Sequence, residues 1–162
     1  MTDWLTRDQR SRNMAAIRST GTSTERRLHA ALKLLFPRRK IIEDADLPGR
    51  PDCYLPGMRL AIFADGCFWH GCPTHGRIPE DNRDYWQPKL ERNAVRDRGA
   101  ILELRRMGIR PLRIWDHELR PAAIDGALNR IRKEAQRPML QGRRRPRHRS
   151  PHLGAGDKPG PR

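Results

Sequence analysis

Residues 66–75, GCFWHGCPTH, combine metal-binding side chains with large aromatic rings in a single short stretch. Zinc in structural sites is held by four tetrahedral Cys or His ligands. Three candidates follow the spacing C-x4-C-x2-H: Cys67, Cys72 and His75. The fourth has to come from elsewhere, and His117 competes for this place with His70, which lies between the two cysteines. Ordinary buried cysteines and surface histidines are the alternative, but such a cluster rarely occurs without a metal, so we expect a zinc site.

Two aspartates, Asp52 and Asp65, lie at the ends of two consecutive predicted strands. Phosphodiester hydrolysis needs a divalent cation and a base that activates water, and Mg²⁺ prefers carboxylate and carbonyl oxygens. A Pro-Asp pair followed by a second acidic strand end resembles the PD-(D/E)xK nuclease signature, although such a pair is usually no more than a turn. The lysine of that signature is missing here. His70 stands nearby, and an imidazole with a pKa near 6.5 can accept a proton from water.

The net charge of +15, from 34 Lys or Arg against 19 Asp or Glu, favours a polyanionic partner. Nucleic acid is the first candidate. An anionic membrane surface is the second, but the chain has no basic amphipathic helix typical of a membrane anchor. Residues 137–162 carry about half of the excess charge and are rich in Arg, Pro and Gly. Because such a composition cannot bury a core, we expect a disordered basic tail after a domain at residues 1–136.

Other features favour a cytoplasmic protein without disulfides. The longest apolar run falls well short of the roughly 20 residues that span a bilayer, and the N-terminus does not resemble a signal peptide. Three cysteines are too few, and odd in number, for a disulfide scaffold. The third, Cys53, is expected to be a small core residue.

The order of the predicted elements indicates an α/β domain with a mixed sheet. A basic helix over residues 6–19 precedes a second helix that Thr22 and Glu25 start with a capping box and Pro37 ends. The hydrophobic pattern predicts strands near residues 41–42, 53–55, 58–65 and 110–115. It also predicts helices over residues 84–107, with Gly108 as the C-cap glycine, and 121–135.

Six segments, in this order and spacing, resemble the very-short-patch-repair (Vsr-type) mismatch endonucleases: RSRNMAAIRS, TSTERRLHAAL, LPGRPD, FADGCFWHGCPTH, YWQPKLERNAVRD and GIRPLRIWDHEL. The resemblance covers roughly residues 8–133. It implies a PD-(D/E)xK restriction-endonuclease-like fold with a structural zinc. It also implies an enzyme that nicks double-stranded DNA on the 5′ side of the T in T:G mispairs, which arise by deamination of 5-methylcytosine, with Mg²⁺ as the catalytic ion.

The resemblance also assigns roles to single residues. Asp52 and the carbonyl of Ala64 match the Mg²⁺ contacts, and His70 matches the histidine that activates water, which leaves the zinc to Cys67, Cys72, His75 and His117. Glu25 and Asp97 match acidic residues that support catalysis. Some members have a histidine, thought to work with the residue at Asp97, where this chain has Asp65. Two acids would face each other here, so we expect Asp65 to bind the metal or to support a residue that does.

The aromatic residues fit the opening of a mispaired step. Inserting a side chain costs a few kcal/mol of unstacking per step, and base–aromatic stacking returns about 1–3 kcal/mol. The resemblance assigns this wedge to Phe68, Trp69 and Trp86, with Met14 and Ile17 entering from the opposite groove. Core packing is the alternative for Phe68, Trp69, Met14 and Ile17. Five arginines are candidates for phosphate contacts, with solvated surface charge as the alternative: Arg12, Arg18, Arg26, Arg92 and Arg96.

Two other functions remain open on the sequence. One is a zinc-stabilised DNA-binding module that does not cut, and the other is a restriction-type nuclease of the same fold that cuts matched duplex. The first gives no reason for Asp52 and His70 to lie beside the zinc loop. The preferred reading is a monomeric enzyme whose partner is double-stranded DNA with a T:G mismatch, with mismatch-repair proteins as further candidate partners and no role for a membrane.

Overall fold

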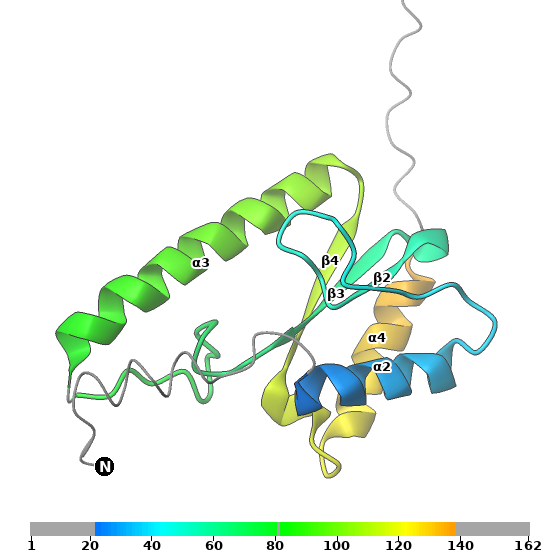
Figure 1. Cartoon of the computed structure of the whole chain (residues 1–162). Helices are drawn as coiled ribbons and strands as arrows, with labels where there is room; N and C mark the ends of the chain where they lie inside the picture. Colours follow the sequence, from blue (N-terminus) through cyan, green and yellow to red (C-terminus); the bar gives the residue numbers. More distant parts are fainter. Residues whose placement is uncertain (1–21, 81, 139–162) are drawn as a thin grey trace, which may run out of the picture.

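The computed structural model describes residues 22–80 and 82–138 (Figure 1). The predicted helix over residues 6–19, including Met14 and Ile17, lies outside these residues, as do Arg12, Arg18 and all but the first two residues of the predicted tail. The elements are α2 (Ser23–Leu35), β1 (Ile42–Glu43), β2 (Cys53–Leu55), η1 (Pro56–Met58), β3 (Leu60–Asp65), α3 (Arg83–Arg106), β4 (Arg110–Trp115), η2 (Asp116–Leu119) and α4 (Ile124–Gln136).

The four strands form one sheet in the order β1-β2-β3-β4, and its mixed character confirms the prediction. The pairs β1/β2 and β2/β3 are antiparallel, whereas β3 and β4 run parallel and are joined by the long helix α3. In Figure 1, α3 lies on one side of the sheet, and α2 and α4 lie side by side on the other. This topology brings the C-terminal ends of β3 and β4 to the same edge.

Alternating residues of β3 and β4 separate the interior into two layers. Ile62 and Ile114 face α2 and α4 in the larger cluster, where Leu28, Leu32 and Ile131 are also fully buried. Cys53 lies in the same cluster and is 1% exposed, which confirms its predicted place in the core. This burial raises the pKa of its thiol to about 12. Ala61 of β3 points to the opposite face of the sheet. It packs there against Leu104 of α3 and Ile109 in the smaller cluster.

Local signals at two helix ends are confirmed. The side-chain oxygen of Thr22 accepts a hydrogen bond from the backbone N–H of Glu25, 3.2 Å away, and so caps α2. After α3, Gly108 has a φ of +70°. Its N–H donates to the carbonyl of Arg105, and the N–H of Ile109 donates to that of Leu104. This Schellman arrangement turns the chain directly into β4.

Two predicted boundaries were wrong. The strand predicted over residues 58–65 begins at Leu60, because residues 56–58 form a 3-10 turn and Arg59 adopts a left-handed conformation, with φ +47°. The last helix begins at Ile124 rather than at residue 121, because η2 and the turn after it occupy the chain as far as residue 123. In both places a short turn precedes the regular element. The hydrophobic pattern of the element continues through the turn, so the sequence alone places the boundary too early.

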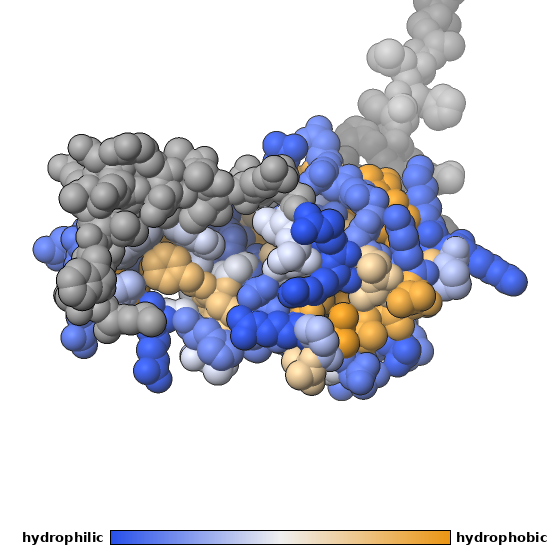
Figure 2. All heavy atoms as spheres, turned by 60° about the horizontal axis from the view of Figure 1, so that its bottom comes forward, coloured by the Kyte–Doolittle hydropathy of each residue, from blue (hydrophilic) through white to orange (hydrophobic). Residues whose placement is uncertain are grey.

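Hydrophilic residues make up most of the face shown in Figure 2, with smaller hydrophobic areas between them. Within the described residues, no helix combines the length and the apolar character that crossing a membrane requires.

Candidate active site

The predicted zinc ligands come together at the shared edge of β3 and β4. One ligand atom from each of Cys67, Cys72, His75 and His117 lies within 4.8 Å of the others. Nδ1 of His117 is 3.1 Å from Sγ of Cys67 and 3.7 Å from Sγ of Cys72, and Nδ1 of His75 is 3.9 Å from Sγ of Cys72. His117 lies with the other three residues, whereas His70 has a different partner, so the geometry favours His117 as the fourth ligand.

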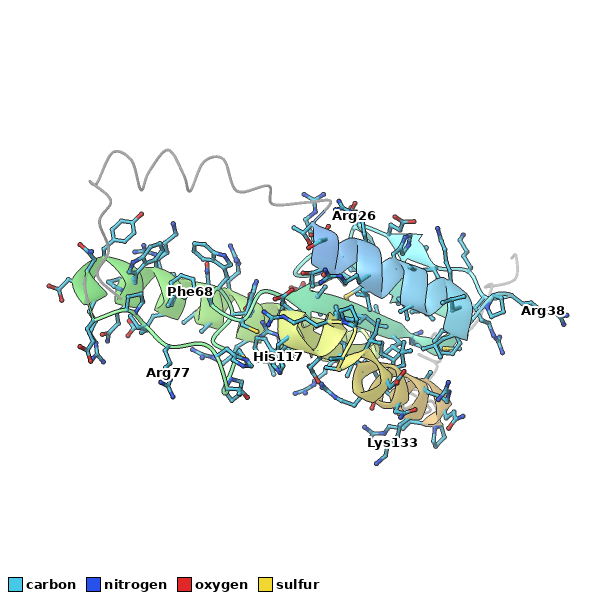
Figure 3. All side chains as sticks on the ribbon, turned by 90° about the horizontal axis from the view of Figure 1, so that it is seen from below. Arg26, Arg38, Phe68, Arg77, His117 and Lys133 are labelled. Atoms are coloured by element: carbon cyan, nitrogen blue, oxygen red, sulfur yellow. The ribbon has the colours of Figure 1, made fainter. Side chains whose placement is uncertain are left out.

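The strand register explains how residues so distant in sequence meet. Asp65, at the end of β3, pairs with Trp115, at the end of β4. The loop that carries the two cysteines leaves from the first position, and η2, which carries His117, leaves from the second. Figure 3 shows His117 in the segment that leads into α4, and Phe68 beside α3.

The spacing of these four atoms fits zinc. Zn–S bonds of about 2.3 Å and Zn–N bonds of about 2.0–2.1 Å in a tetrahedron place neighbouring ligand atoms about 3.3–3.8 Å apart. The sulfur–nitrogen distances of 3.1–3.9 Å bracket this range. Two thiolates and two imidazoles are also a common structural zinc set. The four residues can therefore hold the ion after small shifts of their side chains.

Asp52 lies beside the end of β3, because the antiparallel β2/β3 pair places the start of β2 there. Its Oδ2 accepts a hydrogen bond of 2.7 Å from the backbone N–H of Ala64. Burial, together with the charges of Glu25 and Asp65, raises the pKa of Asp52 to about 6, although the hydrogen bond from Ala64 opposes the shift. Among the described residues, no positive charge offsets this shift, and a divalent cation would supply one.

His70 and Asp97 form a second pair across the same cleft. Nδ1 of His70 is 2.6 Å from Oδ2 of Asp97, which lies on α3. Because an ionised carboxylate can only accept, we assign the proton to Nδ1. The other ring nitrogen, Nε2, is then an acceptor, which is the form that can take a proton from water.

The sequence suggested that Asp65 and Asp97 would face each other as two acids. In the structure, a positively charged side chain binds both of them. Arg113, in β4, donates from Nε to Asp65 and from a terminal nitrogen to Oδ2 of Asp97, 3.1 Å away. Sequence reasoning missed Arg113. The available signal was a charged residue between Leu112 and Ile114, in a strand otherwise read as apolar.

Three aromatic rings predicted to form the wedge lie together. The ring centroids of Phe68 and Trp69 are 5.0 Å apart, and both lie within 5.8 Å of that of Trp86. Phe68 and Trp69 are half-buried, whereas Trp86 is only 7% exposed. In this conformation Trp86 therefore supports the other two rings, and a direct contact of its own with DNA stays a prediction.

Helix α3 fixes the loop at two successive residues. The side-chain amide of Asn93 donates to the backbone carbonyl of Trp69, 3.3 Å away, and Asp97, one turn later, binds His70. Asn93 is a second residue that sequence reasoning left without a role, although the i, i+4 spacing of the two already placed them on one helix face.

These groups open into one cleft with a volume of about 480 Å³. Its wall includes Glu25 and Asp52 on one side and Trp69, His70 and Arg96 on the other. A buried acid that can hold a cation and an imidazole oriented as a base are the groups that metal-assisted phosphodiester hydrolysis uses.

Comparison with known proteins gives relatives of one kind. A family profile described as DNA mismatch endonuclease Vsr matches residues 2–75. The type II nicking enzyme V.NaeI of Lentzea aerocolonigenes is 47% identical over 113 residues, which are 67% of this chain and 68% of that protein. The type II nicking enzyme V.XorIIP of Xanthomonas oryzae pv. oryzae is 36% identical over 133 residues, 81% of this chain and 97% of that protein. The DNA mismatch endonuclease Vsr of Escherichia coli is 37% identical over 124 residues, 74% and 77% of the two chains.

Proposed function

Because the chain belongs to the Vsr family of DNA mismatch endonucleases, we propose that it nicks duplex DNA on the 5′ side of the T in T:G mispairs. The observation that carries this proposal is that Asp52, Trp69 and His70 line one cleft, and that Asp97 holds the ring of His70. A DNA-binding module without activity would not need an imidazole oriented by a carboxylate beside a second, uncompensated carboxylate.

The chain's own residues divide the hydrolysis between them. Asp52 and the carbonyl of Ala64 would hold Mg²⁺, and the ion, when bound, supplies positive charge to the scissile phosphate. Nε2 of His70 takes a proton from the attacking water, while Asp97 keeps the ring in place and stabilises the imidazolium that forms. Glu25 adds negative charge beside Asp52 and so favours cation binding at this end of the cleft.

The four-residue Cys/His cluster is proposed to bind zinc and to stiffen the loop that carries the wedge. Phe68 and Trp69 follow Cys67 directly, so the ligand bond fixes the backbone from which both rings project. Less conformational freedom is then lost when the rings enter the DNA.

Replacing the wedge ring tests its role in opening the mispair. We expect Trp69→Leu to slow nicking of a T:G duplex about 10- to 100-fold, because base–aromatic stacking of about 1–3 kcal/mol per base is lost. Single-turnover nicking with saturating enzyme measures the effect. Tyr54→Leu, on β2 and away from the cleft, is the matched control for loss of a ring. Equal rates for Trp69→Leu and the wild type would remove Trp69 from the wedge.

Substrate choice is tested with three labelled duplexes that differ at one pair: T:G, C:G and T:A. We expect a nick in the T-containing strand of the T:G duplex, dependent on Mg²⁺, and intact strands in the other two. Cleavage of the C:G duplex would instead favour a restriction-type enzyme. Intact T:G duplexes in all flanking sequences, with both metals present, would contradict the proposal.

A further inference from the structure

Arg113 interrupts the apolar pattern of β4 at the level of the cleft. Its neighbours Leu112 and Ile114 pack into the core on the α2/α4 side. Arg113 itself points to the other face of the sheet, toward α3, and its side chain is 27% exposed. A charged side chain at such a position requires partners, because desolvating a guanidinium is costly unless it is paired.

The guanidinium has three partners, each from a different place in the fold. Asp65, at the end of β3, receives the Nε–H, and Asp97, on α3, receives an N–H from a terminal nitrogen 3.1 Å away. The ring of Trp115 lies 5.3 Å from the guanidinium carbon. Burial alone would lower the pKa of Arg113, but the hydrogen bond and charge of Asp65, together with Asp97, raise it above its ordinary value.

Asp97 uses one oxygen for two bonds. Its Oδ2 accepts from Arg113 and also from Nδ1 of His70, 2.6 Å away. Asp65 lies close enough to compete, since its Oδ1 is 3.7 Å from the same Nδ1. Without the guanidinium of Arg113, the carboxylates of Asp65 and Asp97 would repel each other. The imidazole of His70 would then have two alternative acceptors.

We propose that Arg113 is a positioning residue, which binds Asp65 and Asp97 together and so fixes the carboxylate oxygen that orients His70. The inference rests on the proposed function, because it assigns His70 the role of base. Arg113 binds Asp65 through Nε and so holds that carboxylate away from the imidazole, while its terminal nitrogen fixes the Asp97 oxygen that the imidazole contacts. In this arrangement Asp65 supports the base and is not a metal ligand.

Direct contact with a DNA phosphate is the competing role for Arg113. The side chain lines a cavity of about 310 Å³ next to His70, together with Arg50 and Arg96. A phosphate contact contributes to binding of the duplex, whereas a positioning role affects the chemical step. Affinity and single-turnover rate, measured separately, therefore distinguish the two.

The test uses Arg113→Met in the full chain. We expect its single-turnover rate on the T:G duplex to fall about 10- to 100-fold, because small misplacements of a base have effects of this size. Affinity for the same duplex, measured without Mg²⁺, should stay within about threefold of the wild type. Arg96→Met, which removes a charge from the same cavity without touching either aspartate, is the matched control and should change affinity more than rate.

A double variant tests the mechanism. The loss of rate in Arg113→Met is expected to come from the unpaired charge of Asp65. The double variant Arg113→Met/Asp65→Asn should therefore nick at least about threefold faster than Arg113→Met alone, which is a non-additive result. Thermal unfolding and zinc content show whether each variant is folded, and Arg113→Lys, which keeps the charge, replaces Arg113→Met if the latter does not fold. An unchanged rate, or a parallel fall in affinity, would overturn the inference. Failure of the wild type to nick would overturn the proposed function instead.

Discussion

Asp52→Asn should lower the nicking rate by about three orders of magnitude or more, while binding of the T:G duplex survives. The substitution keeps the size of the side chain and an oxygen that can accept from Ala64, but it removes the charge that would hold Mg²⁺. Single-turnover nicking and gel-shift affinity, measured on one preparation, check the two parts. Glu43→Gln, an exposed acid on β1, is the matched control. Loss of binding in a folded Asp52→Asn protein would contradict the assigned role.

The same substitution should stabilise the protein when no divalent cation is present. Because the pKa of Asp52 is raised from 3.8 to about 6, folding favours its protonated form. That favourable contribution is complete below about pH 4 and is lost as the pH rises through 6. At pH 8 the ionised group then costs on the order of 1–2 kcal/mol of folding free energy, with allowance for solvent screening.

Thermal unfolding measures this effect directly. Asp52→Asn should unfold at a higher temperature than the wild type at pH 8, and the difference should shrink toward pH 5. Added Mg²⁺ should raise the midpoint of the wild type and leave that of the variant unchanged. A variant that is less stable at pH 8 would show that Asp52 has compensating partners without the metal.

Removal of zinc is the second change with a large expected effect. Structural zinc contributes an apparent 10–16 kcal/mol or so in small zinc domains, comparable with the whole stability of a protein of this size. We expect a zinc-selective chelator, with Mg²⁺ in excess, to lower the unfolding midpoint by at least about 10 °C and to abolish nicking. Unchanged unfolding after the metal has been removed would contradict a structural role.

Variants of single ligands test whether zinc binds at the four-residue cluster and not at any available thiol. Cys67→Ser and His117→Gln should each lose the ion, so elemental analysis should find about one zinc per wild-type chain and far less in either variant. Cys53→Ala removes a buried thiol outside the cluster and should retain the metal. Full zinc content in His117→Gln would return His70 to consideration as the fourth ligand.

The site was largely predictable where residues lie close in sequence or at strand ends. The spacing of Cys67, Cys72 and His75 already gave three ligands, and the tendency of neighbouring strands to end together brought in His117. That His117, and not His70, completes the set depends on the parallel register of Asp65 with Trp115. The pairing of β3 with β4 joins segments about 50 residues apart, so spacing within either segment does not reveal it.

Arg113 shows what local patterns omit. Its role depends on contacts with β3 and α3 at the same time, and no spacing within β4 encodes them. The left-handed conformation of Arg59 likewise ends a turn that hydrophobic periodicity cannot distinguish from the first residues of a strand. In both cases tertiary packing decides the outcome, and propensity contributes little.

Trp69 and His70 are consecutive residues, and α3 holds both through Asn93 and Asp97. The ring that would test the DNA and the imidazole that would start the reaction therefore share one short, tethered piece of backbone. Displacement of the indole by a well-stacked duplex would tilt the imidazole away from its water at the same time. Fidelity would then require no separate checkpoint, since rejection of the substrate and misalignment of the base would be a single mechanical event.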